Sequence, residues 1–263
     1  MNRLRTSFQQ LHSLNKKAFV PYITPEFPVP GTTVPLILAL EKAGASFIEV
    51  GVPFSDPIAD GPTIQHSSLI ALRNGATVSK ILEAVSATRR LTDLPIVLMG
   101  YMNPILRYGI DGFLQDAHEA GVDGVIVPDL LPDEGDVWRT VSQRHGISDI
   151  FLVAPTTSEK RIRYIDSVAS DFTYCVSVTG VTGARTNLGD SVSLDTFLRR
   201  VKANTTKPFV VGFGISNREQ VQSVCRYADG VVVGSALLRS IENERSVEGA
   251  VRAAGKFFSS LVS

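Results

Sequence analysis

Short apolar runs rich in β-branched residues alternate with longer segments of helical period along the whole chain. This alternation is typical of βα units around a parallel sheet. Eight such pairs in 263 residues match the arithmetic of a closed (β/α)8 barrel, which we expect to form one domain over 1–263. The alternative is a doubly wound open sheet, which would usually place a glycine-rich turn after its first strand, where this chain has TPEFP. The expected strands are 19–24, 47–51, 95–99, 124–127, 149–153, 172–177, 208–212 and 230–233.

Charged residues are balanced, with 26 Lys and Arg against 26 Asp and Glu. A net charge of zero argues against a general nucleic-acid partner or an anionic membrane surface, but it allows a local site for a small anion. No apolar stretch approaches transmembrane length, and the N-terminal residues lack the apolar core of a secretion signal. Cys175 and Cys225 show no disulfide pattern, so we expect reduced thiols and a cytoplasmic protein.

Glu49 lies within the second expected strand, FIEVG. Period-two alternation places Glu49 opposite Ile48 and Val50, so it points into the barrel if those two pack under helices. Burial would raise the pKa of this carboxyl and suit it to proton transfer. The alternative is a structural glutamate satisfied by an interior cation or water, although no expected strand contains Arg or Lys.

The loop after this strand, PFSDPIADGPT, is stiffened by three prolines. Asp60 directly precedes Gly61 and Pro62. From spacing alone, Asp60 fits two roles equally well, the cap of a helix that begins near Pro62 and a catalytic carboxylate.

Glycines follow the last three expected strands, in 179–185, 212–216 and 234–236. Such loops bring backbone N–H groups close to an anion, and (β/α)8 barrels commonly bind phosphate at this place. Ser235 begins a short apolar segment whose helix dipole would favour the same anion. The alternative is that these are ordinary turn glycines. That alternative would explain any one loop well, but three such loops at neighbouring strand ends favour a phosphate site.

Other kinds of barrel chemistry find little support. All four histidines fall in helical segments, which disfavours histidine-ligated metal at the strand ends. Lys207 precedes its strand and so lies at the wrong end of the barrel for a Schiff base. Acid–base chemistry by carboxylates on a phosphorylated, otherwise apolar substrate remains.

The segment 49–65, EVGVPFSDPIADGPTIQ, closely resembles the hallmark segment of the tryptophan synthase alpha subunit family. Further matches are FVPY at 19–22, YMNP at 101–104, PDL at 128–130, SVTGVTG at 177–183, GFGIS at 212–216 and GSA at 234–236. The resemblance covers essentially the whole chain. It implies a lyase that cleaves indole-3-glycerol phosphate to indole and glyceraldehyde 3-phosphate without metal or cofactor in this chain.

The resemblance also implies roles for particular residues. Glu49 matches the general acid–base, and Asp60 matches the carboxylate that binds the indole N–H. Thr182 matches a residue of a mobile loop that closes over the substrate. The remaining matches are the pocket residues Tyr22, Tyr101, Tyr174 and Phe213 and the phosphate binders Gly183, Gly214, Gly234 and Ser235.

Two segments depart from the commoner family pattern. The turn at 24–28 replaces a Gly-Asp-Pro turn, and Val178 stands where some members have arginine. The first departure leaves the geometry of the loop after the first strand open, and the second could alter the mobile loop. Neither touches the carboxylates or the phosphate-binding glycines.

The family's partner is a beta subunit that carries pyridoxal phosphate, in an alpha2beta2 heterotetramer. The resemblance therefore implies a partner surface, which we expect at Pro53, Asp56, Pro57 and Asn103. Two alternatives stay open here: a stand-alone lyase that needs no partner, and a non-catalytic activator of the beta subunit.

Overall fold

The strands all run parallel and form one sheet in the computed structural model, which describes residues 2–176, 193–212 and 214–262. Their order in the sheet is β5-β4-β3-β2-β1-β9-β8-β7-β6. This order follows the chain around a barrel, so the predicted (β/α)8 class is confirmed. The strands are β1 (Ala18–Ile23), β2 (Ile48–Gly51), β3 (Ile96–Met99), β4 (Gly124–Ile126), β5 (Ser148–Ile150), β6 (Leu152–Val153), β7 (Thr173–Val176), β8 (Phe209–Gly212) and β9 (Gly230–Val233).

The expected strand at 149–153 is divided in the structure. Its first part, β5, pairs with β4, and its second part, β6, pairs with β7. Phe151 separates the two parts, and its carbonyl accepts a hydrogen bond from the Tyr174 N–H at 3.1 Å. One bent strand therefore closes the barrel, which is why the described residues contain nine strands where eight were expected.

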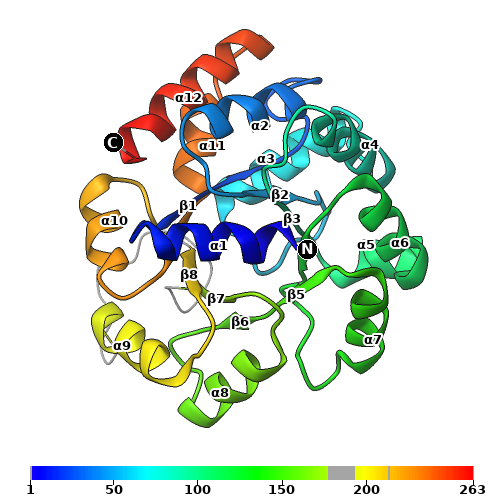
Figure 1. Ribbon diagram of the computed structural model, residues 1–263. Coiled ribbons are helices and arrows are strands. Elements are labelled where there is room, and N and C mark those ends of the chain that lie inside the picture. The colour runs from blue at the N-terminus through cyan, green and yellow to red at the C-terminus, as the bar shows by residue number, and fades with distance from the viewer. Residues whose placement is uncertain (1, 177–192, 213, 263) are drawn as a thin grey trace.

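Helices surround the barrel (Figure 1). They are α1 (Arg3–Ser13), α2 (Thr33–Lys42), α3 (Pro62–Arg73), α4 (Val78–Arg89), α5 (Met102–Tyr108), α6 (Ile110–Ala120), α7 (Asp136–His145), α8 (Glu159–Val168), α9 (Leu194–Asn204), α10 (Arg218–Cys225), α11 (Ser235–Ile241) and α12 (Val247–Val262). The four histidines lie in helices, as predicted. None of the helices described is both long and apolar enough to cross a membrane.

Helix α1 lies across one end of the barrel (Figure 1). Its Phe8 ring contacts Phe47 and Phe172, with ring centroids 5.7 and 5.4 Å away. Phe47 and Phe172 directly precede β2 and β7, so this aromatic cluster closes the N-terminal end of the barrel. The opposite end, at the carboxyl ends of the strands, is left for chemistry.

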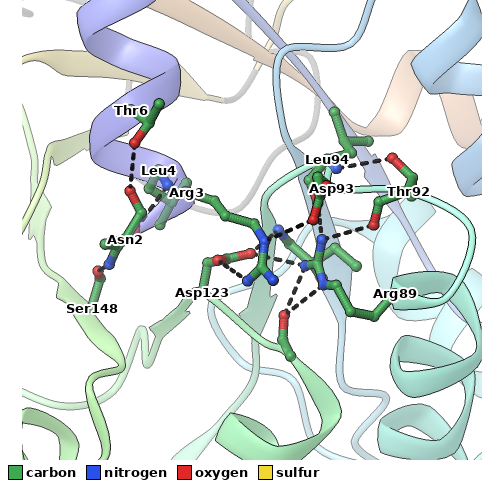
Figure 2. Close-up of polar contacts among 12 residues, drawn as sticks. Asn2, Arg3, Leu4, Thr6, Arg89, Thr92, Asp93, Leu94, Asp123 and Ser148 are labelled. Carbon is green, nitrogen blue, oxygen red and sulfur yellow. Dashed lines mark hydrogen bonds and ion pairs between the residues drawn. The ribbon is translucent and has the colours of Figure 1, made fainter.

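Polar contacts fasten α1 to the barrel (Figure 2). The buried Asp123 carboxylate accepts hydrogen bonds from Arg3 at 3.1 Å and from Arg89 at 3.0 Å. The Asn2 side chain caps α1 through the Leu4 N–H at 2.8 Å. Because Asp123 is both buried and paired with two guanidinium groups, this cluster fixes the position of α1 under the strands.

The loop at 24–28 is held by hydrogen bonds, which answers the question that its unusual sequence raised. The Glu26 carboxylate accepts from the Thr33 hydroxyl and from the Gly31 N–H, each at 2.6 Å. The Asn74 side chain donates to the Glu26 carbonyl at 2.8 Å and ties the loop to the end of α3. These contacts take the place of a glycine turn.

Candidate active site

Glu49 points into the barrel, as the alternation predicted. Its neighbours Ile48 and Val50 are completely buried on the other face of β2. The Glu49 side chain lines a cavity at the carboxyl ends of the strands and is only 2% exposed. No ion pair joins Glu49 to a Lys or Arg among the residues that the structure describes. The structural alternative of a paired interior cation therefore finds no support.

Burial separates the pKa values of the two candidate catalytic carboxyls. Desolvation, with a smaller contribution from the charge of Asp60, raises the pKa of Glu49 to about 8. Desolvation also raises the pKa of Asp60, but a hydrogen bond from Tyr101 opposes it, and that pKa is about 6. At neutral pH Glu49 therefore holds a proton while Asp60 is mostly ionised. One site thus contains a proton donor, Glu49, and a negative charge, Asp60.

Asp60 does not cap helix α3. Gly61 occupies the N-cap position of this helix, and no side chain caps the helix there. The Asp60 carboxylate instead lines the cavity, with the residue 8% exposed. The capping interpretation of Asp60 is thus wrong, because its side chain turns inward while its carbonyl accepts from the Gln65 side chain at 2.9 Å.

Tyr101 holds the loop that carries Asp60. Its hydroxyl accepts a hydrogen bond from the Ala59 N–H at 3.0 Å and hydrogen-bonds to Asp60. The Tyr101 ring packs on Phe54 with the ring centroids 5.6 Å apart. Tyr101 was expected at the pocket wall, but it is not among the described residues that line the cavity. In this structure it positions Asp60.

Tyr22 and Tyr174 line the cavity, as expected. Each ring extends over a glycine at the end of a neighbouring strand, Gly51 for Tyr22 and Gly212 for Tyr174. A methyl group added at either glycine would overlap the tyrosine hydroxyl. These glycines therefore make room for the two rings. The sequence did not reveal this role for Gly51, and it suggested anion binding for the loop that begins at Gly212.

Another part of the cavity wall comes from the loops after β8 and β9. Gly214, which has a left-handed φ of +82°, lines it together with Gly234 and Ser235. Arg239, one helical turn after Ser235 in α11, also lines the cavity and donates to the Thr63 hydroxyl at 3.2 Å. Sequence reasoning missed this cation, although the i, i+4 spacing from Ser235 was a usable signal. The cavity volume is about 580 Å³, counted to its open mouth.

Three of the expected substrate-binding residues lie outside the described residues. They are Thr182, Gly183 and Phe213. Val178, the second departure from the family pattern, lies there too. Their proposed roles stay predictions.

The expected partner surface is only partly accessible. Asp56 and Asn103 are exposed, but Pro53 and Pro57 are buried in the chain's own packing and offer little surface. Ile58, which directly follows Pro57, is 80% exposed, and Leu106, one turn after Asn103 on α5, is also exposed. The exposed Ile58 and Leu106 therefore join Asp56 and Asn103 as candidates for partner contact.

A second buried strand carboxylate faces the other way. Asp149 in β5 accepts hydrogen bonds from the Trp138 indole N–H and the Ser142 hydroxyl, each at 2.7 Å. Both donors lie on α7, so Asp149 points at the helices. It is therefore a structural group.

Proton transfer is the chemistry that this site offers. Within the described ranges, no group of His, Cys, Asp and Glu is arranged to hold a metal ion. The two inward carboxyls differ in protonation state at neutral pH and share one cavity. The chain is thus a (β/α)8-barrel protein with two inward carboxyls at its strand ends, an arrangement that could support acid–base catalysis.

Comparison with known proteins specifies the family. The sequence matches the family described as tryptophan synthase alpha chain over residues 8–260. The alpha chain of Geotalea uraniireducens is 50% identical over 248 residues, covering 94% of this chain and 92% of its own length. That of Chlorobium phaeobacteroides is 46% identical, covering 94% of this chain and 95% of its own. The chain belongs to the tryptophan synthase alpha chain family, whose members are lyases of tryptophan biosynthesis.

Solved structures of this family have the same fold. A tryptophan synthase alpha subunit from Legionella pneumophila superposes with a TM-score of 0.87 at 37% identity, covering 99% of this chain and 97% of the other. A chain of the tryptophan synthase complex from Pyrococcus furiosus superposes with a TM-score of 0.83 at 38% identity, covering 93% and 97%. The fold predicted from the sequence is therefore that of its family.

Proposed function

We propose that this chain cleaves indole-3-glycerol phosphate by a retro-aldol reaction, which gives indole and glyceraldehyde 3-phosphate. The observation that carries the proposal is one cavity lined by two buried carboxyls, Glu49 and Asp60, and also by Gly234, Ser235 and Arg239. Burial raises the pKa values of the two carboxyls to different extents. Family membership supports the same reaction. The chain itself carries no cofactor in this proposal.

The two carboxyls divide the proton transfers. Protonated Glu49 delivers its proton to C3 of the indole ring, and the ionised Asp60 accepts the indole N–H and stabilises the positive charge that develops on the ring. The Glu49 carboxylate then takes the proton of the glyceryl hydroxyl next to the ring. The carbon–carbon bond breaks, its electrons return to the indole, and the hydroxyl carbon becomes the aldehyde, so Glu49 ends protonated as it began.

A direct assay tests the proposal. The purified chain is incubated with indole-3-glycerol phosphate, and indole release is measured with and without a tryptophan synthase beta subunit. Release of indole supports the lyase. A chain that stimulates the beta subunit but releases no indole would be the non-catalytic activator, a reading that the intact pair Glu49 and Asp60 disfavours.

The anion end of the cavity gives a prediction for binding. Gly234→Asp places a carboxylate where the phosphate should lie, so inhibition by glycerol 3-phosphate should weaken by at least ~10-fold. Arg239→Gln removes the cation and should weaken it by about fivefold, less at high salt because an exposed charge is screened. Inhibition constants from the indole-release assay measure both effects.

A matched control is Arg252→Gln, which removes an exposed arginine from α12 and should change nothing. Equal inhibition constants for the parent chain and Gly234→Asp would mean that the phosphate binds elsewhere.

We propose further that the chain acts with a beta subunit, in an alpha2beta2 heterotetramer whose pyridoxal phosphate is held by the beta subunit. The exposed residues Asp56, Ile58 and Asn103 support a contact beside the loop that carries Asp60. Indole is small, neutral and apolar, so direct transfer to a bound partner would prevent its loss by diffusion. A partner docked on this loop could also position Asp60 for catalysis.

Binding of a beta subunit should therefore activate the chain. We expect indole production to rise at least roughly tenfold, which corresponds to about 1.4 kcal/mol of transition-state stabilisation. Asp56→Ala should diminish that stimulation more than it diminishes the basal rate, because Asp56 is exposed while Asp60 keeps its contact with Tyr101. Full basal activity without stimulation by, or co-elution with, a beta subunit would favour the stand-alone lyase.

A further inference from the structure

Three hydroxyl groups form a buried chain from the cavity to helix α3. The Tyr22 hydroxyl, at the cavity, hydrogen-bonds to Thr24, and the Thr24 and Ser67 hydroxyl oxygens are 2.7 Å apart. Ser67 lies 2.9 Å from the Ile64 carbonyl of α3, to which it donates. Tyr22 is 6% exposed, Thr24 1% and Ser67 not at all. Water therefore has little access to this chain, and the three hydroxyls depend on one another.

Each hydroxyl has one hydrogen, so the chain has a direction. When Ser67 donates to the Ile64 carbonyl, Thr24 donates to Ser67 and Tyr22 donates to Thr24. The Tyr22 oxygen can then only accept a hydrogen bond from the cavity. In the reverse direction Ser67 donates to Thr24, Thr24 donates to Tyr22, and Tyr22 donates into the cavity.

The cavity end of the chain faces the catalytic carboxyls. Burial and the nearby charge of Asp60, with a smaller effect of Glu49, hold the pKa of Tyr22 well above its usual range. Tyr22 is also next to Glu49 across the β1–β2 pairing. Two other titratable groups line the cavity, Tyr174 on β7 and Arg239 on α11, and Tyr101, which holds the Asp60 loop, also lies near Tyr22. The Tyr22 hydroxyl therefore stays protonated and lies where the carboxyl charge changes during turnover.

We propose that Tyr22 is a positioning residue whose hydroxyl, directed by Thr24 and Ser67, donates to the carboxyl pair when the pair carries the greater negative charge and accepts when it is protonated. The reversal needs only rotation of three hydroxyl hydrogens, and no proton leaves the chain. It costs about one hydrogen bond, because the Ile64 carbonyl loses its contact with Ser67. This role rests on the proposed lyase function, in which Glu49 gives up and regains a proton in each cycle.

Two substitutions test the direction of the chain, and they should have opposite effects. Tyr22→Phe keeps the ring but removes the donor to the carboxylates, so the apparent pKa of the carboxyl pair should rise. Thr24→Val removes the group that competes for the Tyr22 hydrogen, so Tyr22 donates only into the cavity and the apparent pKa should fall. We expect shifts of about half a pH unit or more in each direction.

The measurement is an NMR titration of the Glu49 and Asp60 carboxyl carbons in the ligand-free protein, together with the pH dependence of kcat. In the Tyr22→Phe background, Thr24→Val should cause no further shift, because its effect acts through the Tyr22 hydroxyl. Tyr22→Phe should also lower kcat about fivefold, with a smaller change in KM, since it alters the carboxyls more than the binding of substrate.

Thr88→Val is the matched control. The Thr88 hydroxyl is buried in α4 and donates to the Ala84 carbonyl at 2.8 Å, away from the cavity, so its loss should leave titration and kcat unchanged. Shifts of the same sign for Tyr22→Phe and Thr24→Val, or additive shifts in the double variant, would overturn the proposal. The titration needs no turnover, so it tests the role of Tyr22 even in a chain that releases no indole. Absence of indole release would reject the proposed lyase function but not the role of Tyr22.

Discussion

Glu49→Gln should lower the rate of indole release by at least ~10²-fold, the usual scale of a general acid–base contribution. Glutamine keeps the shape of the side chain but has no titratable proton to deliver to the indole ring. The phosphate end of the cavity, with Gly234, Ser235 and Arg239, is unchanged. Binding should therefore persist, so kcat should fall far more than KM rises.

Asp149→Asn is the matched control for this loss. Asp149 is also a buried strand carboxyl whose pKa is raised by burial, to about 6, but it accepts hydrogen bonds from Trp138 and Ser142 on the helical side. Its amide variant should reduce stability, because the amide nitrogen cannot accept a hydrogen bond and one of the two donors loses its acceptor. It should retain turnover in the folded protein. Near-normal indole release by Glu49→Gln, with an unchanged far-UV circular dichroism spectrum, would show that Glu49 is not the acid–base group.

The direction of Glu49 could be predicted because a strand has only two faces. Alternation with Ile48 and Val50 was enough to place the carboxyl inside the barrel. The same rule could not place Asp60, since a loop has no fixed period and the spacing before Pro62 suits a cap as well as a catalytic group. Family resemblance favoured catalysis, and the structure shows that Asp60 lines the cavity, because Gly61 takes the cap position and Tyr101 holds the Asp60 loop.

Features that depend on contacts between distant elements were missed. Arg239 reaches the cavity because α11 packs beside α3, where Arg239 contacts Thr63. Gly51 matters because Tyr22 from the neighbouring strand lies over it. The division of β5 from β6 also depends on their different neighbours, β4 and β7. Local sequence patterns contain none of these pairings.

The buried Glu49 carboxyl should make the protein less stable as the pH rises. Its pKa is about 8 in the folded chain and near the ordinary value of 4.5 when unfolded. Between these values the unfolded chain has released the proton and the folded chain still binds it, so the free energy of unfolding falls with increasing pH. The stability is fully present below about pH 4.5 and is lost as the pH rises through about 8, and the loss from this one group is on the order of 5 kcal/mol.

Glu49→Gln removes this dependence and should therefore be more stable than the parent chain at pH 8.5, although it is nearly inactive. The two proteins should have similar stability at pH 4.5, where Glu49 is neutral in the folded chain and half neutral in the unfolded one. Urea unfolding at both pH values measures the difference, and Glu83→Gln, at an exposed position of α4, controls for the loss of a surface carboxyl. A difference between Glu49→Gln and the parent that stays constant with pH would mean that Glu49 ionises as readily in the folded protein as in water. The site would then lack the protonated acid that the cleavage reaction requires, so this stability measurement examines the mechanism without any substrate.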